Sequence, residues 1–328
     1  MLEASSAVAA AGVDRDTRGP AAGRVALHPQ LGFAAAVHVD AHAAHVALVD
    51  PTGAVRAETH AAFPPRGERV QHITELVEAC RRTVQGPLLL AVVGIPGIVT
   101  ADGGIRDDQG PDGGAFKNAL SARLDCPVRV ENDVNLAALA ELSEGTGAEL
   151  GSFALLLLDD GLGAGIVIDG SLHRGFSGVA GEVMYLPQSP LPIGAPVLGD
   201  PVVRDLALAH GRDPEETIDQ HLDAAWAGDP AALAMAAEMG RRLTLIAGSI
   251  ALVLDPEAFL LSGTAAHPAL ARAAATFAEE LAPQLPLTLV VSSFGPEAPL
   301  VGAIGEAASA LRASVFSLVL PASDRSRR

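Results

Sequence analysis

The sequence is poor in cysteine, lysine and aromatic residues, and each shortage excludes a class of structure or partner. Its 328 residues include two cysteines, Cys80 and Cys126, which are too few for a disulfide framework or a cysteine-rich zinc cluster. Aromatic residues make up 3% of the chain, so the core must be built from Ala, Val, Leu and Ile. Lys117 is the only lysine, and the formal net charge of −17 disfavours binding to DNA phosphates or anionic lipid.

The chain also has no long hydrophobic run. The longest apolar segment, residues 243–254, is too short to cross a bilayer, which takes about 20 residues. The first residues lack the basic region and apolar stretch of a secretory signal. We therefore expect a cytoplasmic protein without a membrane span. Residues 1–30 show no sustained periodicity and are predicted to form a flexible tail.

Two similar series of strands and helices follow. Short strand-like runs begin at Phe33, a helical pattern covers 68–84, and a buried strand over 88–96 ends in a Gly-Ile-Pro-Gly loop. The second half repeats this layout, starting with a hairpin over 152–175. The pattern predicts a duplicated α/β architecture with a cleft between two lobes, and strand ends at such a cleft usually bind ligands. Pro96–Gly97 lies at one such strand end and is a candidate ligand-binding pair.

Five segments carry a resemblance to a known family: VVGIPGIVT, VRVENDVNLAALAE, GAGIVIDGSLHRGFSGVAGEV, LDPEAFLLSG and PLVGAIGEAA. In this order they resemble the ROK (repressor, open reading frame, kinase) family, from about Gly23 to Leu318. The resemblance implies the actin-like ATPase domain, a duplicated α/β fold of the ribonuclease H-like class with two lobes and an interlobe cleft. Members include sugar kinases, sugar-responsive repressors and orphan proteins, and homodimers are usual.

The predicted division places the N-terminal lobe at residues 31–131, completed by a C-terminal helix at about 300–318. The C-terminal lobe is predicted at 132–299, and 319–328 form a second tail. Family repressors carry a winged helix-turn-helix before the lobes. Residues 1–30 show no such pattern, so we expect no nucleic-acid binding by this chain itself.

The residues that contact sugar in the family are retained. Asn132 and Asp133 match the sugar-binding Asn and the catalytic Asp that accepts a hydroxyl proton, and Glu182 matches a glutamate that binds sugar hydroxyls. A purely structural interpretation of Asn132–Asp133 is a helix N-cap before VNLAALAE. A buried Glu182 beside Gly181 would in either case need a polar partner.

The residues that bind ATP in the family are not retained. Family kinases have Asp-x-Gly-Gly-Thr in the first hairpin, and a gapless fit places His38, Asp40, Ala41 and His42 at the Asp, Gly, Gly and Thr positions. His38 cannot replace a hard carboxylate for magnesium. Asp40 puts a negative side chain where phosphate would lie and prevents close approach of the backbone.

The second hairpin shows the same change. Asp159, Asp160 and Gly161 stand where the family has Gly-Thr-Gly, so two carboxylates face the place of the phosphate. A third element, residues 260–268, has one glycine where the family usually has two, and it is more simply interpreted as an ordinary strand-to-helix turn. We therefore expect no ATP and no other cofactor.

The chain also lacks the family's zinc element, in which Gly-Glu-x-Gly-His precedes a cysteine-rich loop. Tyr185 stands at the histidine position and no cysteine follows, which excludes a zinc site of that type. Tyr185 either donates to a ligand or lies at the edge of the proline-rich loop 187–196. His38, Asp40 and His42 alternate as metal ligands on one strand face would. The turn expected across these residues breaks that face, so we expect no metal.

The expected function is binding of a sugar-like small molecule by a repressor-like ROK pseudokinase that acts as a regulator or sensor. One alternative is an ATP-independent enzyme that uses Asp133 as base and Glu182 as its acid–base partner, with Tyr185 assisting. The other is an ATP-dependent sugar kinase. Retention of a catalytic-type Asp motivates the ATP-independent enzyme, because a pure sensor needs only hydrogen bonds at that position.

Overall fold

The structure is a computed structural model that describes residues 8–14, 22–28, 31–40, 42–62, 68–107, 110–188 and 195–319. The chain divides into two compact units. The first comprises Met1–Gly97, Asp102–Glu131 and Ala303–Arg328, and the second comprises Ile98–Ala101 and Asn132–Gly302. The chain therefore passes from the first unit to the second between Glu131 and Asn132, beside the predicted ligand residues.

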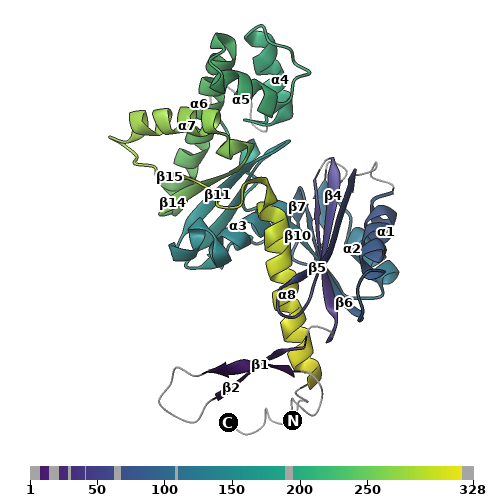
Figure 1. Cartoon of the computed structure of the whole chain (residues 1–328). Coiled ribbons are helices and arrows are strands. Elements are labelled where there is room, and N and C mark those ends of the chain that lie inside the picture. Colours follow the sequence, from purple (N-terminus) through teal and green to yellow (C-terminus); the bar gives the residue numbers. More distant parts are fainter. Residues whose placement is uncertain are drawn as a thin grey trace. The chain divides into compact units, whose positions relative to one another are not determined.

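The sheet of the first unit has five strands in the order β10-β6-β3-β4-β5 (Figure 1). The strands are β3 (Phe33–Val39), β4 (Ala43–Val49), β5 (Val55–Ala62), β6 (Leu88–Ile95) and β10 (Val128–Asn132). Strand β3 pairs antiparallel with β4 and parallel with β6, and β4 pairs antiparallel with β5. Strand β3 is buried along its whole length, as expected for a central strand with both faces covered.

Three helices belong wholly or partly to this unit: α1 (Arg69–Arg81), α2 (Ala115–Leu124) and α8 (Ala298–Val319). Helix α1, predicted from the pattern over 68–84, packs on β4 and β5 and against α2. Figure 1 shows α1 and α2 on the same side of the sheet. Two short strands, β8 (Ile105–Asp107) and β9 (Gly110–Pro111), pair with each other before α2.

The described part of the predicted N-terminal tail contains a hairpin. Strands β1 (Val8–Asp14) and β2 (Ala22–Leu27) pair antiparallel, which differs from the structureless tail that the sequence predicts. The segment is rich in Ala and Gly and has no regular alternation of apolar and polar residues, so the usual signal for a strand is missing. The other residues assigned to tails, 1–7, 15–21, 29–30 and 320–328, lie outside the described residues.

The sheet of the second unit has the order β13-β12-β11-β14-β15. Its strands are β11 (Phe153–Leu158), β12 (Leu162–Ile168), β13 (Ser171–Leu172), β14 (Ala258–Gly263) and β15 (Leu289–Val291). In both units the first strand is central, the next two form a meander on one side, and the last two lie on the other side. This shared order confirms the predicted duplication.

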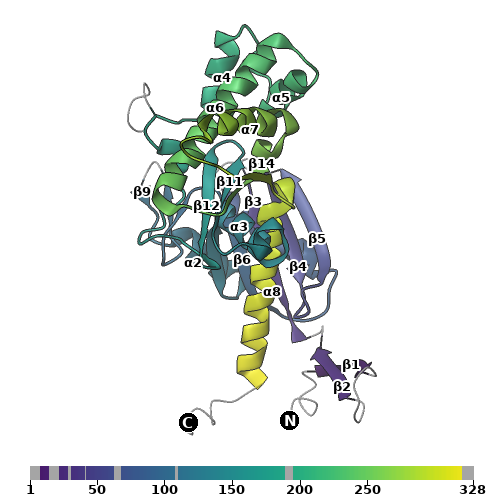
Figure 2. The ribbon, with the colours of Figure 1, turned by 90° about the vertical axis from the view of Figure 1, so that its left-hand side faces the viewer.

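Five helices surround this second sheet or extend from it: α3 (Asp133–Glu144), α4 (Asp200–Ala209), α5 (Ile218–Trp226), α6 (Pro230–Leu254) and α7 (Pro268–Leu281). Helices α4 to α7 group together at one end of the unit (Figures 1 and 2). The remaining short elements are β7 (Ile98–Val99), η4 (Thr146–Glu149), η5 (Val183–Tyr185), η6 (Thr264–Ala266) and η7 (Gly295–Glu297). No helix in the described ranges has the length and apolar character that a membrane span requires.

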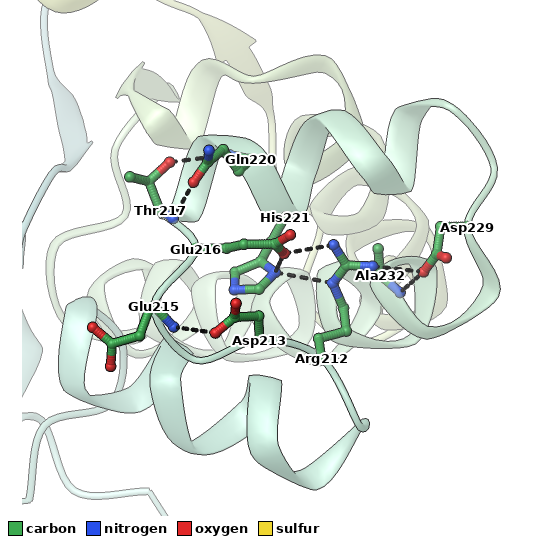
Figure 3. Close-up of polar contacts among 9 residues, drawn as sticks. All are labelled: Arg212, Asp213, Glu215, Glu216, Thr217, Gln220, His221, Asp229 and Ala232. Atoms are coloured by element: carbon green, nitrogen blue, oxygen red, sulfur yellow. Dashed lines mark hydrogen bonds and ion pairs between the residues drawn. The ribbon is translucent and has the colours of Figure 1, made fainter.

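Arg212, in the loop after α4, connects α5 and α6 through one guanidinium group (Figure 3). It donates to Nδ1 of His221 at 2.9 Å, to Asp229 at 2.9 Å and to Glu216 at 2.7 Å. Asp229 also accepts the Ala232 N–H at 2.8 Å and so caps α6. Burial and the neighbouring charge of Arg212 lower the pKa of His221, which keeps the ring neutral and able to accept this bond.

We expect Arg212→Lys to lower the free energy of unfolding by about 2 kcal/mol, because one ammonium cannot serve three acceptors in different directions. Urea denaturation measures the change. The matched control is Glu215→Gln, since the Glu215 carboxylate points away from the cluster in Figure 3. Equal stability of the lysine variant and the wild type would contradict the connecting role of Arg212.

Three histidines lie in register across β3, β4 and β5. His38 is paired with His45, and His45 with His60. The ring centroids are 6.4 Å apart in the first pair and 5.4 Å apart in the second, where the rings stack with an interplanar angle of 16°. His38 is 8% exposed, and burial lowers its pKa to about 4, aided by the charge of His45 and opposed by Asp40.

This lowered pKa predicts a loss of stability in acid. The unfolded chain binds a proton at His38 below pH 6.5, whereas the folded chain does not until about pH 4. His38→Val removes the titration, so its stability relative to the wild type should rise by about 3 kcal/mol between pH 7 and pH 4. Urea denaturation at both pH values measures this, with the exposed His42→Val as control. Parallel pH profiles of His38→Val and the wild type would contradict the burial argument.

Candidate functional site

The first part of the candidate site is the start of α3. Asn132 is the N-cap of this helix, and its side chain accepts the Asn135 N–H at 3.0 Å. Asp133 is the next residue, is buried, and accepts the Val134 N–H at 2.8 Å. The capping role that the sequence suggests for this pair is therefore present in Asn132. Asp133 lies in the first turn of α3, where the helix dipole favours a negative charge and offsets part of the cost of burying the carboxyl.

Two glycines of β12 bring α3 directly onto the sheet. A Cβ at Gly163 would overlap the Val134 side chain, and a Cβ at Gly165 would overlap the Ala138 side chain and the Val134 carbonyl. Because no side chain separates the helix from the strand, the first turn of α3 lies against the backbone of β12. This close packing fixes the place of Asp133 relative to the sheet.

Glu182 is held to the same strand by the residue before it. Gly181 accepts the Ala164 N–H at 2.8 Å and has a φ of +97°, a conformation that favours glycine. A Cβ there would also overlap the Ala164 carbonyl oxygen. Ala164 lies between the two glycines on which α3 packs, so Asp133 and Glu182 come from different segments to one strand of the second unit.

The carboxyl groups of this unit influence one another. The pKa of Asp133 is raised to about 7, mainly by burial and further by the charges of Asp159 and Glu182, while the Val134 N–H opposes the shift. Burial also raises the pKa of Glu182. Three predicted site residues, Asp133, Asp159 and Glu182, thus form one electrostatic group, and Asp133 exchanges its proton near neutral pH.

The second predicted phosphate turn, residues 159–161, is occupied by contacts within the chain. The Asp159 N–H donates to the Gly161 carbonyl at 2.9 Å, and the Asp160 carbonyl accepts the Asp200 N–H at 2.9 Å. Gly161 forms an isolated β-bridge with Gly199. A Cβ at Gly199 would overlap the Asp160 carbonyl, so the segment before α4 lies directly on this turn.

In the first predicted phosphate turn, the side chain of Asp40 binds backbone N–H groups of the same turn. Asp40 Oδ1 accepts the His42 N–H at 2.7 Å and the Ala43 N–H at 2.6 Å. The Asp40 N–H donates to the Ala43 carbonyl at 3.0 Å, which closes the turn. An anion in this turn would therefore compete with a covalently attached carboxylate. Ala41, the other residue fitted to a glycine position, lies outside the described residues.

The three residues of the alternative metal site, His38, Asp40 and His42, lie in different environments. The side chain of Asp40 is used by the turn, and His42 is exposed beyond the end of β3. His38 instead lies in a row of imidazoles with His45 and His60, in which neighbouring ring centroids are 6.4 Å and 5.4 Å apart. Among the described residues, no group of three or more His, Cys, Asp or Glu side chains could hold a metal ion.

The third predicted nucleotide element, residues 260–268, contacts α5. Thr264 donates to Asp219 at 3.2 Å. His267 bonds to Asp223 at 3.2 Å through Nε2 and accepts the Ala269 N–H at 3.2 Å through Nδ1, so it caps α7. These contacts agree with the simpler interpretation of the segment as a strand-to-helix turn.

The other predicted site residues lie near the ends of strands. Tyr185 is in η5, three residues after Glu182, and its side chain is 49% exposed. In the first unit, Pro96 and Gly97 are exposed after β6, and Gly97 has a φ of +103°. Their participation in a ligand site stays a prediction.

Sequence reasoning missed the residue that anchors the far end of α3. Glu141 is fully buried and accepts hydrogen bonds from the Ser292 hydroxyl at 2.6 Å, the Ser293 N–H at 2.7 Å and the Thr146 N–H at 2.7 Å. It joins α3 to the loop between β15 and α8. A polar residue on the apolar face of the ENDVNLAALAE segment was the available signal.

Part of the chain is similar to a known protein family. Residues 34–192 match the model of the ROK family. An uncharacterized protein of Clostridium perfringens is 32% identical over 148 residues, which are 45% of this chain and 50% of the relative. An N-acetyl-D-glucosamine kinase of Histophilus somni is 35% identical over 123 residues, 35% of this chain and 38% of the kinase. The alignments thus span half or less of the length of these curated relatives.

Solved structures match over more of the chain. A ROK family glucokinase from Streptomyces griseus, solved with glucose and AMPPNP, has a TM-score of 0.71 at 23% identity and covers 85% of this chain and 100% of its own. A ROK family transcriptional regulator, a homologue of the E. coli MLC protein, has a TM-score of 0.77 at 20% identity, with 96% and 88% covered. The fold is therefore the actin-like α/β fold of sugar kinases. Over residues 34–192 the chain therefore resembles the ROK family, and it shares its fold with a ROK glucokinase and a ROK transcriptional regulator.

The raised pKa of Asp133 gives a test of its environment. Folded Asp133 keeps its proton up to about pH 7, whereas the unfolded chain releases it near pH 3.8, so this group destabilises the fold as pH rises through that range. Asp133→Asn removes the effect. Its stability relative to the wild type should rise by on the order of 4 kcal/mol between pH 4 and pH 7.

Urea denaturation across this pH range measures the difference. The control is Glu144→Gln, an exposed carboxyl at the other end of the same helix. If the asparagine variant and the wild type keep a constant difference in stability from pH 4 to pH 7, the Asp133 carboxyl does not titrate in a buried environment.

Proposed function

We propose that this protein binds a sugar-like small molecule through Asn132, Asp133 and Glu182, and that it does so without ATP. The observation that carries the proposal is the buried Asp133, whose pKa is raised to about 7 beside the carboxyls of Asp159 and Glu182. A buried carboxyl of this kind needs a polar partner, and the hydroxyl groups of a sugar supply it.

The chemistry of the group suits a polyol. A sugar hydroxyl both donates and accepts a hydrogen bond. An ionised carboxylate only accepts hydrogen bonds, whereas a protonated carboxyl can also donate one. Because the pKa of Asp133 is about 7, this side chain can either accept a hydrogen bond from a sugar hydroxyl or donate one to it near neutral pH. Glu182, held at β12 by Gly181, supplies a second carboxyl from another segment. Sugars in complex with relatives, such as the glucose of the Streptomyces griseus enzyme, are consistent with this ligand class.

We propose that the protein does not bind ATP because of the residues in the two hairpin turns. Asp40 takes two N–H groups of its own turn, and Asp159 and Asp160 add carboxyls to the other turn. The charge of −17 adds a general repulsion of polyanions. The protein is thus proposed to be a regulator or sensor, and its fold resembles that of the ROK transcriptional regulator. A cytoplasmic homodimer is part of the proposal.

An ATP-dependent sugar kinase is a second candidate function. The pKa of Asp133 near 7 favours it, because a general base works best when its pKa lies close to the working pH. In that reaction Asp133 would accept the proton of the sugar hydroxyl that attacks the terminal phosphate. The N-acetyl-D-glucosamine kinase and glucokinase among the relatives support this candidate as well.

An ATP-independent acid–base enzyme is a third candidate. Two carboxyls with raised pKa values, Asp133 and Glu182, favour it, because one can accept a proton while the other donates one. Tyr185 would assist at the edge of the site. Rearrangement, dehydration, epimerisation or hydrolysis of a sugar-like metabolite fits this arrangement.

Calorimetry with D-glucose and N-acetyl-D-glucosamine, each with and without ATP–Mg²⁺, distinguishes these functions. We expect at least one sugar to bind, ATP–Mg²⁺ not to bind, and no phosphorylated or converted sugar to appear by ³¹P and ¹H NMR. Asp133→Ala and Glu182→Ala should weaken sugar binding about tenfold or more, the equivalent of about 1.4 kcal/mol. Glu144→Gln is the control.

Other results of these experiments would support a different function or contradict the proposed site. Micromolar binding of ATP–Mg²⁺ with formation of a sugar phosphate would replace the sensor by the kinase. A converted sugar without ATP would support the third candidate. Binding that is unchanged in both alanine variants would contradict the proposed site.

A further inference from the structure

Arg242 of α6 contacts two residues that follow Tyr185 in the sequence, Gln188 and Val197. The Gln188 side chain donates to the Arg242 carbonyl at 3.2 Å. Nη1 of Arg242 donates to the Val197 carbonyl at 3.1 Å. Through its carbonyl and its guanidinium group, one residue of the 25-residue helix α6 therefore contacts both Gln188 and Val197.

Arg242 is itself fixed in direction. Its Nε donates to Glu238 at 2.8 Å, one helical turn earlier, and its side chain is 15% exposed. Arg241 donates to the same carboxylate at 2.8 Å and 2.9 Å. The hydrogen bonds from Arg241, with those from Arg242, lower the pKa of Glu238 to about 2, so the carboxylate stays charged. With Nε bound to Glu238, the planar guanidinium group presents Nη1 to Val197 in a set orientation.

From Val197 a short series of hydrogen bonds leads to the candidate ligand residues. The Val197 N–H donates to the Met184 carbonyl at 2.9 Å. Met184 is the middle residue of η5, which begins immediately after Glu182 and also contains Tyr185. The Leu186 N–H closes this turn on the Val183 carbonyl at 3.1 Å. The position of Val197 therefore restrains the turn that carries the candidate ligand residues.

The same segment restrains the other carboxyl-bearing turn. Two residues after Val197, Gly199 forms its bridge with Gly161, and the Asp200 N–H bonds to the Asp160 carbonyl. Met184 completes the contact, because its sulfur would lie 3.3 Å from a Cβ at Gly161. The segment 197–200 thus joins the turn after Glu182 to the turn that carries Asp159, and both carboxyls act on Asp133.

We propose that Arg242 is a positioning residue of the ligand site, which orients Glu182 and Tyr185 by holding Val197 and Gln188 to α6. This inference rests on the proposed function for the identity of the site. The segments involved contain little regular structure, so they depend on such side-chain contacts for a fixed shape. Arginine is required because one side chain must bind Glu238 and the Val197 carbonyl in different directions at once.

Hydrogen exchange of the ligand-free protein tests the positioning directly. Arg242→Lys and Gln188→Leu should each raise amide exchange at residues 183–186 and 197–200 about tenfold. The matched control is Arg241→Lys, which weakens the same pairing with Glu238 but should leave exchange in both segments unchanged. Thermal melting of the three variants checks that all of them remain folded.

Binding of D-glucose, measured by calorimetry, tests whether the positioning reaches Glu182. Arg242→Lys should weaken binding about tenfold in the wild-type background and clearly less in a Glu182→Ala background, because the contribution of an oriented Glu182 is already lost there. A residue that only stabilises the fold would weaken binding equally in both backgrounds, and that result would overturn the proposal.

The hydrogen-exchange experiment tests the role of Arg242 whether or not the proposed function is correct. Unchanged exchange in both Arg242→Lys and Gln188→Leu, or an equal rise in Arg241→Lys, would overturn the positioning role whether or not a sugar binds. If the wild type binds neither D-glucose nor N-acetyl-D-glucosamine, the proposed function fails, while localised exchange in the variants still supports the role of Arg242 in holding these turns.

Discussion

Helix α3 lies directly on strand β12, with glycine at both points of closest approach, and the candidate site depends on this contact. Gly163 and Gly165 leave no room for a Cβ beneath Val134 and Ala138. Burial of the first turn of α3 follows from this packing, and with it the raised pKa of Asp133. A chain with 3% aromatic residues builds its core through such close contacts between small residues.

The turns around the site are also closely packed. Gly181 and Gly199 lie against the backbone carbonyls of Ala164 and Asp160, so each turn is fixed by backbone contacts. In the first unit, Asp40 binds the N–H groups of its own turn. Anion-binding groups are thus paired within the chain, whereas the carboxyls near Asp133 gather into one group. This contrast is the basis for proposing a neutral polyol as the ligand in place of a phosphate.

Much of the fold and part of the candidate site were predictable from the sequence. The remaining features were not, because they lack a local sequence pattern or depend on contacts between residues far apart in the chain. Periodicity and turn residues predicted the duplicated α/β architecture and helix α1, because both depend on local patterns. The N-cap at Asn132 also followed from residue type. The hairpin β1–β2 lacks an alternating pattern, and the roles of Glu141 and Arg242 depend on partners about 150 and 45 residues away in the sequence. Contacts of that separation leave no local signal.

We propose that a sugar-like ligand binds at Asp133 and Glu182 and that nucleotide does not bind at the turns of Asp40 and Asp159. A crystal structure of the protein grown with both D-glucose and the magnesium complex of AMPPNP tests this proposal. Sugar hydroxyl oxygens should lie within hydrogen-bond distance of both carboxyls, and no nucleotide should be present at the two turns. Phosphate oxygens bound at either turn would contradict it.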